Sequence, residues 1–405
     1  MKKGFLSEYF NGVTVKRLSG VETNPGQSNQ HEFNGVKPLK NLLGSEKLTN
    51  CPSKFLWLGE DDRVVSEDSF VTWYDARDNH PTRSEFRLYF KSNSVMDLAI
   101  SGDLLIVARR PSGEIMIIIV SSGSTVESQL LWLFGVSNQI DVDFEYREFE
   151  QDDTAVDFAT RYILEELGIE IEEPEADRMD ALLEQFGGKF PKTSIFSSFV
   201  RATLPEVNPL DGPDEALLAW IEREEKLFRR LERHIVSDRL EAGFMSNEGA
   251  DVNGFIQFSL SVQNRRKSRA GYALENHLEE VFRVCGATFD SQAVTENKSK
   301  PDFLFPGGDE YHNPDFPESS LIMLGVKSTC KDRWRQVLSE AARIPNKHLF
   351  TLEPGISENQ TNEMMANCLQ LVLPRGLHAT YRENQQQWLW DLDSFITLVK
   401  GKAGT

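Results

Sequence analysis

The sequence has little of what marks a secreted or membrane protein. Its 405 residues include four cysteines, far apart and without a CxxC pair; this indicates reduced thiols, and neither a disulfide framework nor a zinc site. No apolar run reaches the roughly 18 residues of a membrane span, because Arg109, Arg110 and Pro111 interrupt the richest stretch. The first ten residues lack the apolar segment of a signal peptide. We therefore expect a cytoplasmic protein without a membrane partner.

Positive charge is also scarce. The chain has 44 Lys and Arg against 63 Asp and Glu, a formal net charge of −19. This total argues against nucleic acid as a partner, but phosphate binding needs positive potential only locally. The acids gather between residues 141 and 185, whereas basic residues gather at 265–269 and 327–335. The composition therefore weakens a nucleic-acid function without excluding it.

Residues 1–145 favour an all-β domain. Short β-forming runs alternate with clusters of Gly, Asn, Pro and Ser, which mark turns. The predicted strands are Gly12–Arg17, Phe70–Tyr74, Phe86–Phe90, Leu104–Ala108 and Ile115–Val120. A Pro-Ser-Gly turn joins the last two strands and predicts a hairpin. We expect a small barrel or sandwich here.

Residues 146–205 form an acidic region in which one helix, Thr154–Leu167, is expected. Its composition is typical of a solvated linker or interdomain helix. A DNA-mimicking or autoinhibitory surface is the alternative. Beyond this region, apolar residues recur at three- and four-residue steps over Pro213–Glu241 and predict a long helix. We assign residues 206–405 to a second domain.

The second domain alternates helices and strands. Its order predicts an α/β core in which helices flank a mixed central sheet. The expected elements are an amphipathic helix from Tyr272, strands Ala287–Val294, Phe303–Phe305 and Leu321–Lys327, a helix around Trp334–Arg343, and strands His348–Leu352 and Leu369–Leu373.

Two strand ends in this domain carry charges that suit metal-dependent phosphodiester hydrolysis. Asp302 follows Pro301 at the start of a buried strand, and Lys327 ends an otherwise apolar one. A lysine there is costly unless it faces a polar cleft. Carboxylates can hold a divalent metal ion, while a cation orients the water and offsets phosphate charge. The spacing is that of the PD-(D/E)xK nucleases.

One acid of that pattern is missing, because Gly325 occupies the usual position two residues before the lysine. The nearest replacement is Glu340, 13 residues beyond Lys327 and on the helix expected around 334–343. Glu275, on the preceding helix, is a candidate for an outer or second metal ligand. Each of these residues alone has a structural explanation, as a turn, a strand-end ion pair or a solvated helical residue. Their order along the chain favours the site.

Lys331, Asp332 and Arg333 follow the lysine strand and are candidates for reading DNA. A helix start with these side chains offers donors to guanine and an acceptor to cytosine in the major groove. The alternative is a helix N-terminus with solvated charges.

Taken together, these motifs resemble the EcoRII-type restriction endonucleases. The similarity covers nearly all of residues 254–380, and the segments that carry it are 264–271, 300–306, 326–336 and 348–352. It implies a restriction-endonuclease-like fold and a homodimer that cuts double-stranded DNA at a short CC…GG-like site, with CCWGG as one candidate. It also implies a cognate cytosine methyltransferase in the same restriction–modification system.

The resemblance assigns roles to the residues already singled out. Asp302 and Glu340 would hold Mg²⁺, with Lys327 and Glu275 completing the catalytic site. Lys331, Asp332 and Arg333 match the basic–acidic–basic triplet that reads guanine and cytosine in related enzymes, and Lys331 has also been considered catalytic.

The first 145 residues resemble the effector domain of the same family, a DNA-binding pseudobarrel shared with plant B-three transcription factors. The segments that carry this likeness are 16–19, the loop that ends at His31, and 82–87. It implies that His31, Arg83, Glu85 and Arg87 contact a second DNA site, as in type IIE enzymes. Two contact positions of the family are Pro81 and Phe86 here, and each loses a positive charge.

Two alternative functions remain open at this point. One is a modification-dependent DNA nuclease, in which the N-terminal domain reads a modified base. The other is a non-catalytic DNA-binding regulator with a decayed nuclease fold, although the joint presence of Asp302, Lys327 and Glu340 argues against decay.

Overall fold

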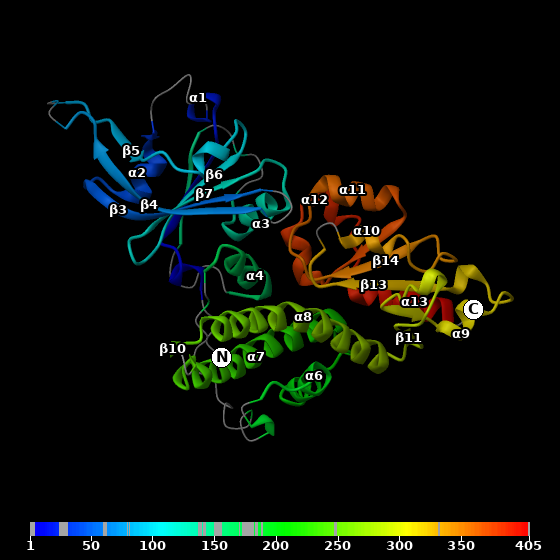
Figure 1. The fold of residues 1–405 in the computed structure, drawn as a ribbon. Coiled ribbons are helices and arrows are strands. Elements are labelled where there is room, and N and C mark those ends of the chain that lie inside the picture. Colours follow the sequence, from blue (N-terminus) through cyan, green and yellow to red (C-terminus); the bar gives the residue numbers. More distant parts are fainter. Residues whose placement is uncertain are drawn as a thin grey trace. The chain divides into compact units, whose positions relative to one another are not determined.

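The chain forms two compact units. The computed structural model describes all residues except 1–4, 24–30, 60–62, 79, 81, 137–139, 141–142, 150–155, 170, 172–181, 183–184, 188, 247–248, 331–332 and 404–405. Unit 1 contains Met1–Ile171 together with Pro354–Asn359 and Ala379–Arg382. Unit 2 contains Glu172–Glu353, Gln360–His378 and Glu383–Thr405. Figure 1 shows the elements of both.

Unit 1 is built on an eight-stranded sheet with the order β2-β5-β4-β3-β7-β6-β1-β8. The strands are β1 (Gly12–Arg17), β2 (Glu32–Gly35), β3 (Leu48–Leu58), β4 (Val64–Asp75), β5 (Phe86–Phe90), β6 (Leu104–Arg109), β7 (Ile115–Val120) and β8 (Glu145–Glu148). Neighbours are antiparallel except β3 and β7. No ladder joins β2 to β8 among the described residues, so the sheet is an open half-barrel. The small barrel or sandwich that we expected, and the pseudobarrel that the resemblance implies, are not confirmed.

The predicted hairpin is confirmed, because β6 and β7 pair antiparallel over their whole length. The long strand β3 has no counterpart among the predicted strands. Pro52 lies inside it and argues against a strand, since proline cannot donate to a ladder. The structure tolerates this proline because the ladder to β7 begins only at Ser53.

Helices cover both faces of the central strands. The unit contains α1 (Gly20–Thr23), α2 (Lys37–Leu43), α3 (Thr125–Leu133) and α4 (Phe158–Glu166). Along β6, Ile106 belongs to one apolar cluster and Leu105 to the other. Burial on both faces explains why β6 and β7 are continuous apolar runs.

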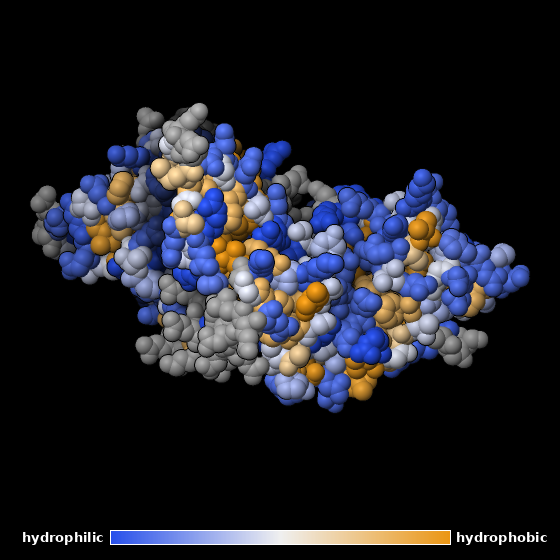
Figure 2. All heavy atoms as spheres, turned by 60° about the horizontal axis from the view of Figure 1, so that its bottom comes forward, coloured by the Kyte–Doolittle hydropathy of each residue, from blue (hydrophilic) through white to orange (hydrophobic). Residues whose placement is uncertain are grey.

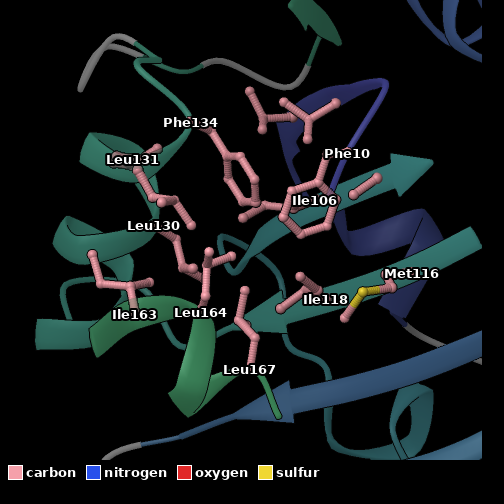
Figure 3. Close-up of a cluster of buried hydrophobic side chains, with 14 of the residues drawn as sticks. Phe10, Ile106, Met116, Ile118, Leu130, Leu131, Phe134, Ile163, Leu164 and Leu167 are labelled. Atoms are coloured by element: carbon pink, nitrogen blue, oxygen red, sulfur yellow. The ribbon is translucent and has the colours of Figure 1, made fainter. Parts of the chain in front are cut away.

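The helix α4 belongs to the core and is not the solvated helix that its acidic neighbourhood suggested. Ile163 and Leu164 are at most 1% exposed and pack with residues of α3 and the sheet. Figure 3 shows them beside Leu130 and Ile118. Asp157 caps the helix, because its side chain accepts a hydrogen bond from the backbone N–H of Thr160 at 2.9 Å.

Unit 2 contains the expected mixed sheet, with the order β11-β12-β13-β14-β15. Its strands are β11 (Asp290–Ser291), β12 (Phe303–Phe305), β13 (Ile322–Lys327), β14 (Lys347–Thr351) and β15 (Leu369–Val372). The first two ladders are antiparallel and the last two are parallel. The expected strand Ala287–Val294 is therefore much shorter than predicted.

Long helices pack beside this sheet. The prediction of a helix at Pro213–Glu241 is confirmed as α7, and the helix expected from Tyr272 begins earlier, as α8 (Val252–Val284). Phe282 of α8 contacts the rings of Phe303, Phe305 and Phe395, and thereby joins α8 to β12 and α13. The remaining helices are α6 (Thr193–Ala202), α9 (Gly308–His312), α10 (Trp334–Val337), α11 (Glu358–Ala366), α12 (Glu383–Gln386) and α13 (Leu392–Ala403).

The described surface is polar with scattered apolar residues. In the view of Figure 2, hydrophobic residues form separate patches between hydrophilic ones. Among the helices that the structure describes, none combines the length and the apolar character needed to cross a membrane.

Candidate active site

Asp302 and Lys327 lie side by side at one end of the β12–β13 ladder. Their side chains are only 10% and 13% exposed, and Lys327 Nζ lies 3.1 Å from Asp302 Oδ2. The same oxygen accepts the backbone N–H of Val326 at 2.6 Å, while Gln292 Nε2 donates to Oδ1 at 3.0 Å. The aspartate is therefore fixed by three donors, and the lysine is fixed by the aspartate.

Position 325 has no room for an acid. Gly325 lies on the same face of β13 as Lys327, because side chains two residues apart share a face. A Cβ atom on Gly325 would lie 2.8 Å from Cγ2 of Val337 on α10, closer than real Cβ contacts come. The side chain of Val337 fills this space, so an acid at position 325 would require Val337 to move.

Glu340 lies on a turn and not on a helix. The helix that we expected around 334–343 is shorter than predicted, because α10 covers only Trp334–Val337. The helix α10 ends at Val337, and the N–H of Glu340 still donates to the Val337 carbonyl at 3.2 Å. The next residue, Ala341, has φ +47°, a left-handed conformation that ends the helical path. Glu340 is therefore the last residue before the backbone turns away at Ala341.

Glu275 and Glu340 feel the same two charges. Burial raises the pKa of Glu275 to about 7; the negative charge of Asp302 adds to this rise and Lys327 opposes it. Burial likewise raises the pKa of Glu340 to about 7, with Lys327 and Lys347 opposing and Asp302 adding. Glu275 and Glu340 thus each lie within electrostatic reach of Asp302 and Lys327.

The chemistry of this donor set suits a hard divalent cation. Glu340 Oε2 is buried and has no hydrogen-bond partner in the described structure. Carboxylate oxygens are the ligands that Mg²⁺ prefers, and Mg²⁺ usually takes only one or two of them and completes its shell with water and phosphate. Among the described residues, no group of three or more His, Cys, Asp or Glu side chains is placed to hold a metal ion.

Of the candidate base-reading residues, only Arg333 lies within the described structure. Lys331 and Asp332 fall outside the described residues. Arg333 is exposed and directly precedes α10. The N–H of Cys330, at the start of this segment, donates to the buried carboxylate of Glu353.

The candidate contact residues of unit 1 divide into two kinds. His31 and Arg83 are exposed. Arg87 is paired with Glu85 and Glu32, and Arg77 Nε lies 2.5 Å from the other oxygen of Glu85. Hydrogen bonding to Arg87 is the main reason that the pKa of Glu85 is lowered. The charges of Glu85 and Arg87 are therefore already engaged within the protein.

The basic cluster 265–269 also has a different environment from the one its composition suggested. Arg269 donates to Glu224 at 2.7 Å and to Glu225 at 2.6 Å, and Arg266 Nε donates to Glu232 at 2.6 Å. These acids lie on α7, whose acidic stretch faces this part of α8. The acidic residues of α7 match the basic residues of α8, and sequence reasoning missed this signal. The match indicates that these arginines form structural ion pairs.

A family model described as "EcoRII C terminal" matches residues 228–396, which include the whole candidate active site. The curated type II restriction enzyme EcoRII of Escherichia coli is 41% identical over 235 residues. Residues 228–396 therefore resemble the C-terminal domain of the EcoRII family. The alignment covers 58% of this chain and 56% of the relative, so the chain spans little more than half of that enzyme's length.

Two solved structures are also similar. They are a metal-depleted complex of Ecl18kI with uncleaved, modified DNA (19% identity, TM-score 0.45, 55% of this chain and 82% of the other) and a complex of the restriction endonuclease PspGI with substrate DNA (17%, 0.44, 53% and 93%).

Proposed function

We propose that the protein is a type II site-specific deoxyribonuclease that hydrolyses double-stranded DNA with Mg²⁺. The observation that carries this proposal is the convergence of Asp302, Lys327, Glu275 and Glu340 in a chain whose curated relative is a restriction enzyme.

The geometry supports a distinct role for each residue. Asp302 and Glu340 would hold the cation, which when bound lowers the pKa of a water molecule and offsets charge on the phosphate. Lys327, fixed on Asp302 at 3.1 Å, orients the attacking water and donates to the phosphate. Glu275 would add a third carboxylate near Asp302 and serve as an outer or second ligand.

The remaining parts of the proposal concern recognition. We assign Arg333, with Lys331 and Asp332 beside it, to base contacts at a CC…GG-like site. A homodimer would match the two-fold symmetry of such a site. Unit 1, as a B-three-like domain, would bind a second DNA copy through His31 and Arg83, with Glu85 and Arg87 as polar contacts. A cytosine methyltransferase would protect the host DNA.

Plasmid cleavage by the full chain tests this function. We expect Mg²⁺-dependent cutting at one sequence, faster on plasmids with two sites than with one. Asp302→Asn should reduce the rate by about a thousandfold, since the lost interactions are worth several kcal/mol. The matched control is Asp309→Asn, an exposed acid on α9. Unchanged cutting by Asp302→Asn contradicts the metal assignment, and cutting of methylated DNA alone favours a modification-dependent nuclease.

A further inference from the structure

A buried lysine lies behind the turn that carries Glu340. Lys347 is the first residue of β14 and is only 6% exposed. Its ammonium donates to the carbonyl oxygens of Ala341 at 3.0 Å and Ile344 at 2.6 Å. Both acceptors belong to residues 341–344, which we call the acid turn because it directly follows Glu340.

Burying a lysine at this position costs free energy. Every residue of β14 is buried, and an ammonium loses its hydration there unless polar groups replace the water. An apolar side chain would satisfy the strand equally well. The two hydrogen bonds to carbonyl oxygens therefore indicate that the role of the ammonium is to stabilise the acid turn.

The acid turn has a conformation that needs support. Ala341 lies in the left-handed region at φ +47°, which residues with a Cβ atom adopt reluctantly. The turn closes on itself through a hydrogen bond from the N–H of Ile344 to the carbonyl of Ala341 at 2.9 Å. Without an external donor, the carbonyls of both residues would compete for other partners and the turn would lose its shape.

A second group holds the turn from another direction. Glu296 accepts the N–H of Ala342 at 3.2 Å and the hydroxyl of Tyr311 at 2.6 Å. That hydroxyl in turn accepts the N–H of Arg343 at 3.3 Å. Glu296 thus binds one N–H group of the turn directly and a second through Tyr311, while the ammonium of Lys347 binds two of its carbonyls.

Lys347 also acts on Glu340 through its charge. Among the described residues, the charged groups that act on Glu340 are Lys327, Asp302 and Lys347. Lys327 is occupied by Asp302, so Lys347 is a second positive charge beside this acid. Glu340 and Glu296 in return oppose the fall that burial causes in the pKa of Lys347.

We propose that Lys347 is a positioning residue: its ammonium fixes the acid turn and so sets the affinity of the Asp302–Glu340 pair for a divalent cation. This inference rests on the proposed function. It concerns a residue that touches neither the reacting atoms nor the cation.

The test measures Mn²⁺ binding to the full-length protein by calorimetry, alongside the Mg²⁺ dependence of plasmid cleavage. Lys347→Met removes the charge and keeps the stem. We expect Mn²⁺ affinity to fall about tenfold or more, as is usual when a residue that supports a metal ligand is lost, and the half-saturating Mg²⁺ concentration to rise in parallel. The control Lys400→Met alters an exposed lysine on α13 and should change neither.

Two further variants keep every outcome informative. Glu340→Gln should weaken Mn²⁺ binding; if it does not, the proposed metal site itself fails. If Glu340→Gln weakens binding but folded Lys347→Met binds as the wild type does, only the positioning role is overturned. Should Lys347→Met not fold, Glu296→Gln loosens the same turn from its exposed side and must lower Mn²⁺ affinity in the same direction; unchanged affinity overturns the inference.

Discussion

Helix α8 contributes to two clusters of charged side chains. In one cluster the acids are matched by bases, and in the other the acids outnumber the bases. Around His277, each acid faces a base: His277 Nε2 lies 2.8 Å from Glu224, and Arg269 lies 2.7 Å from Glu224 and 2.6 Å from Glu225. Around Glu275, two residues earlier, three carboxyl groups share Lys327, and Glu340 keeps a buried oxygen without a hydrogen-bond partner.

The difference teaches that burial of charge does not by itself mark a functional site. The His277 cluster is closed with respect to charge, because Glu224 and Glu225 face Arg269, although Arg269 Nε has no hydrogen-bond partner among the described residues. The Glu275 cluster is incomplete, and a ligand with positive charge would complete it. Substitutions should therefore have opposite effects on stability in the two places.

The largest effect is expected from opening the closed cluster. Glu224→Ala would leave the buried His277 without its acid and Arg269 with Glu225 alone, and breaking a buried ion pair from one side costs about 3–5 kcal/mol. Hydrogen–deuterium exchange of the α7 and α8 amides should accelerate strongly. The control is Glu279→Ala on the exposed side of α8. Equal exchange in both variants would show that the cluster does not stabilise the fold.

A smaller loss is expected where α10 meets β13. In Gly325→Ala the new methyl group would press on Val337, and such overpacking costs about 1–3 kcal/mol. Urea unfolding measures this loss, and cleavage should fall with it because α10 leads to Glu340. Adding Val337→Ala should restore most of the stability. If Gly325→Ala is as stable as wild type, close packing is not what excludes an acid at this position.

The smallest effect, of opposite sign, is expected from relieving the incomplete cluster. Glu275→Gln should increase stability by about 0.5–2 kcal/mol while slowing cleavage. The pKa of Glu275 is about 7 in the folded protein against a reference value of 4.5, so ionisation opposes folding as pH rises from 4.5 to 7. The increase in the free energy of unfolding that Glu275→Gln causes should be absent below pH 4.5 and complete above pH 7. Urea unfolding at pH 4 and pH 8 checks this, and an equal effect at both values contradicts it.

Much of the candidate site can be predicted from the sequence. Asp302 and Lys327 stand out because a charge at the end of an apolar strand needs a polar cleft, and the ladder between β12 and β13 brings them together. Glu340 is predictable as the replacement acid, but the early end of α10 depends on the left-handed Ala341 and on contacts from distant residues. Propensity alone favours a longer helix there.

Other parts escape sequence reasoning for related reasons. Lys347 looks like an ordinary residue before a strand, and its role depends on a turn that only the fold creates. The basic cluster 265–269 suggests DNA binding because the acids that neutralise it lie on another helix, around residues 224–232. The half-barrel likewise depends on how β2 and β8 are placed at opposite ends of the sheet order.

The path of the backbone has a consequence for how the protein can be divided. Two short stretches late in the chain, Pro354–Asn359 and Ala379–Arg382, pack with the N-terminal unit, where the N–H of Ser357 donates to the hydroxyl of Thr125 at 3.3 Å. Three stretches of one unit thus alternate with three of the other. A protease that cuts once near residue 171 would leave the N-terminal product without these two late stretches, so unit 1 is not released whole, whereas every stretch of unit 2 stays in the C-terminal product.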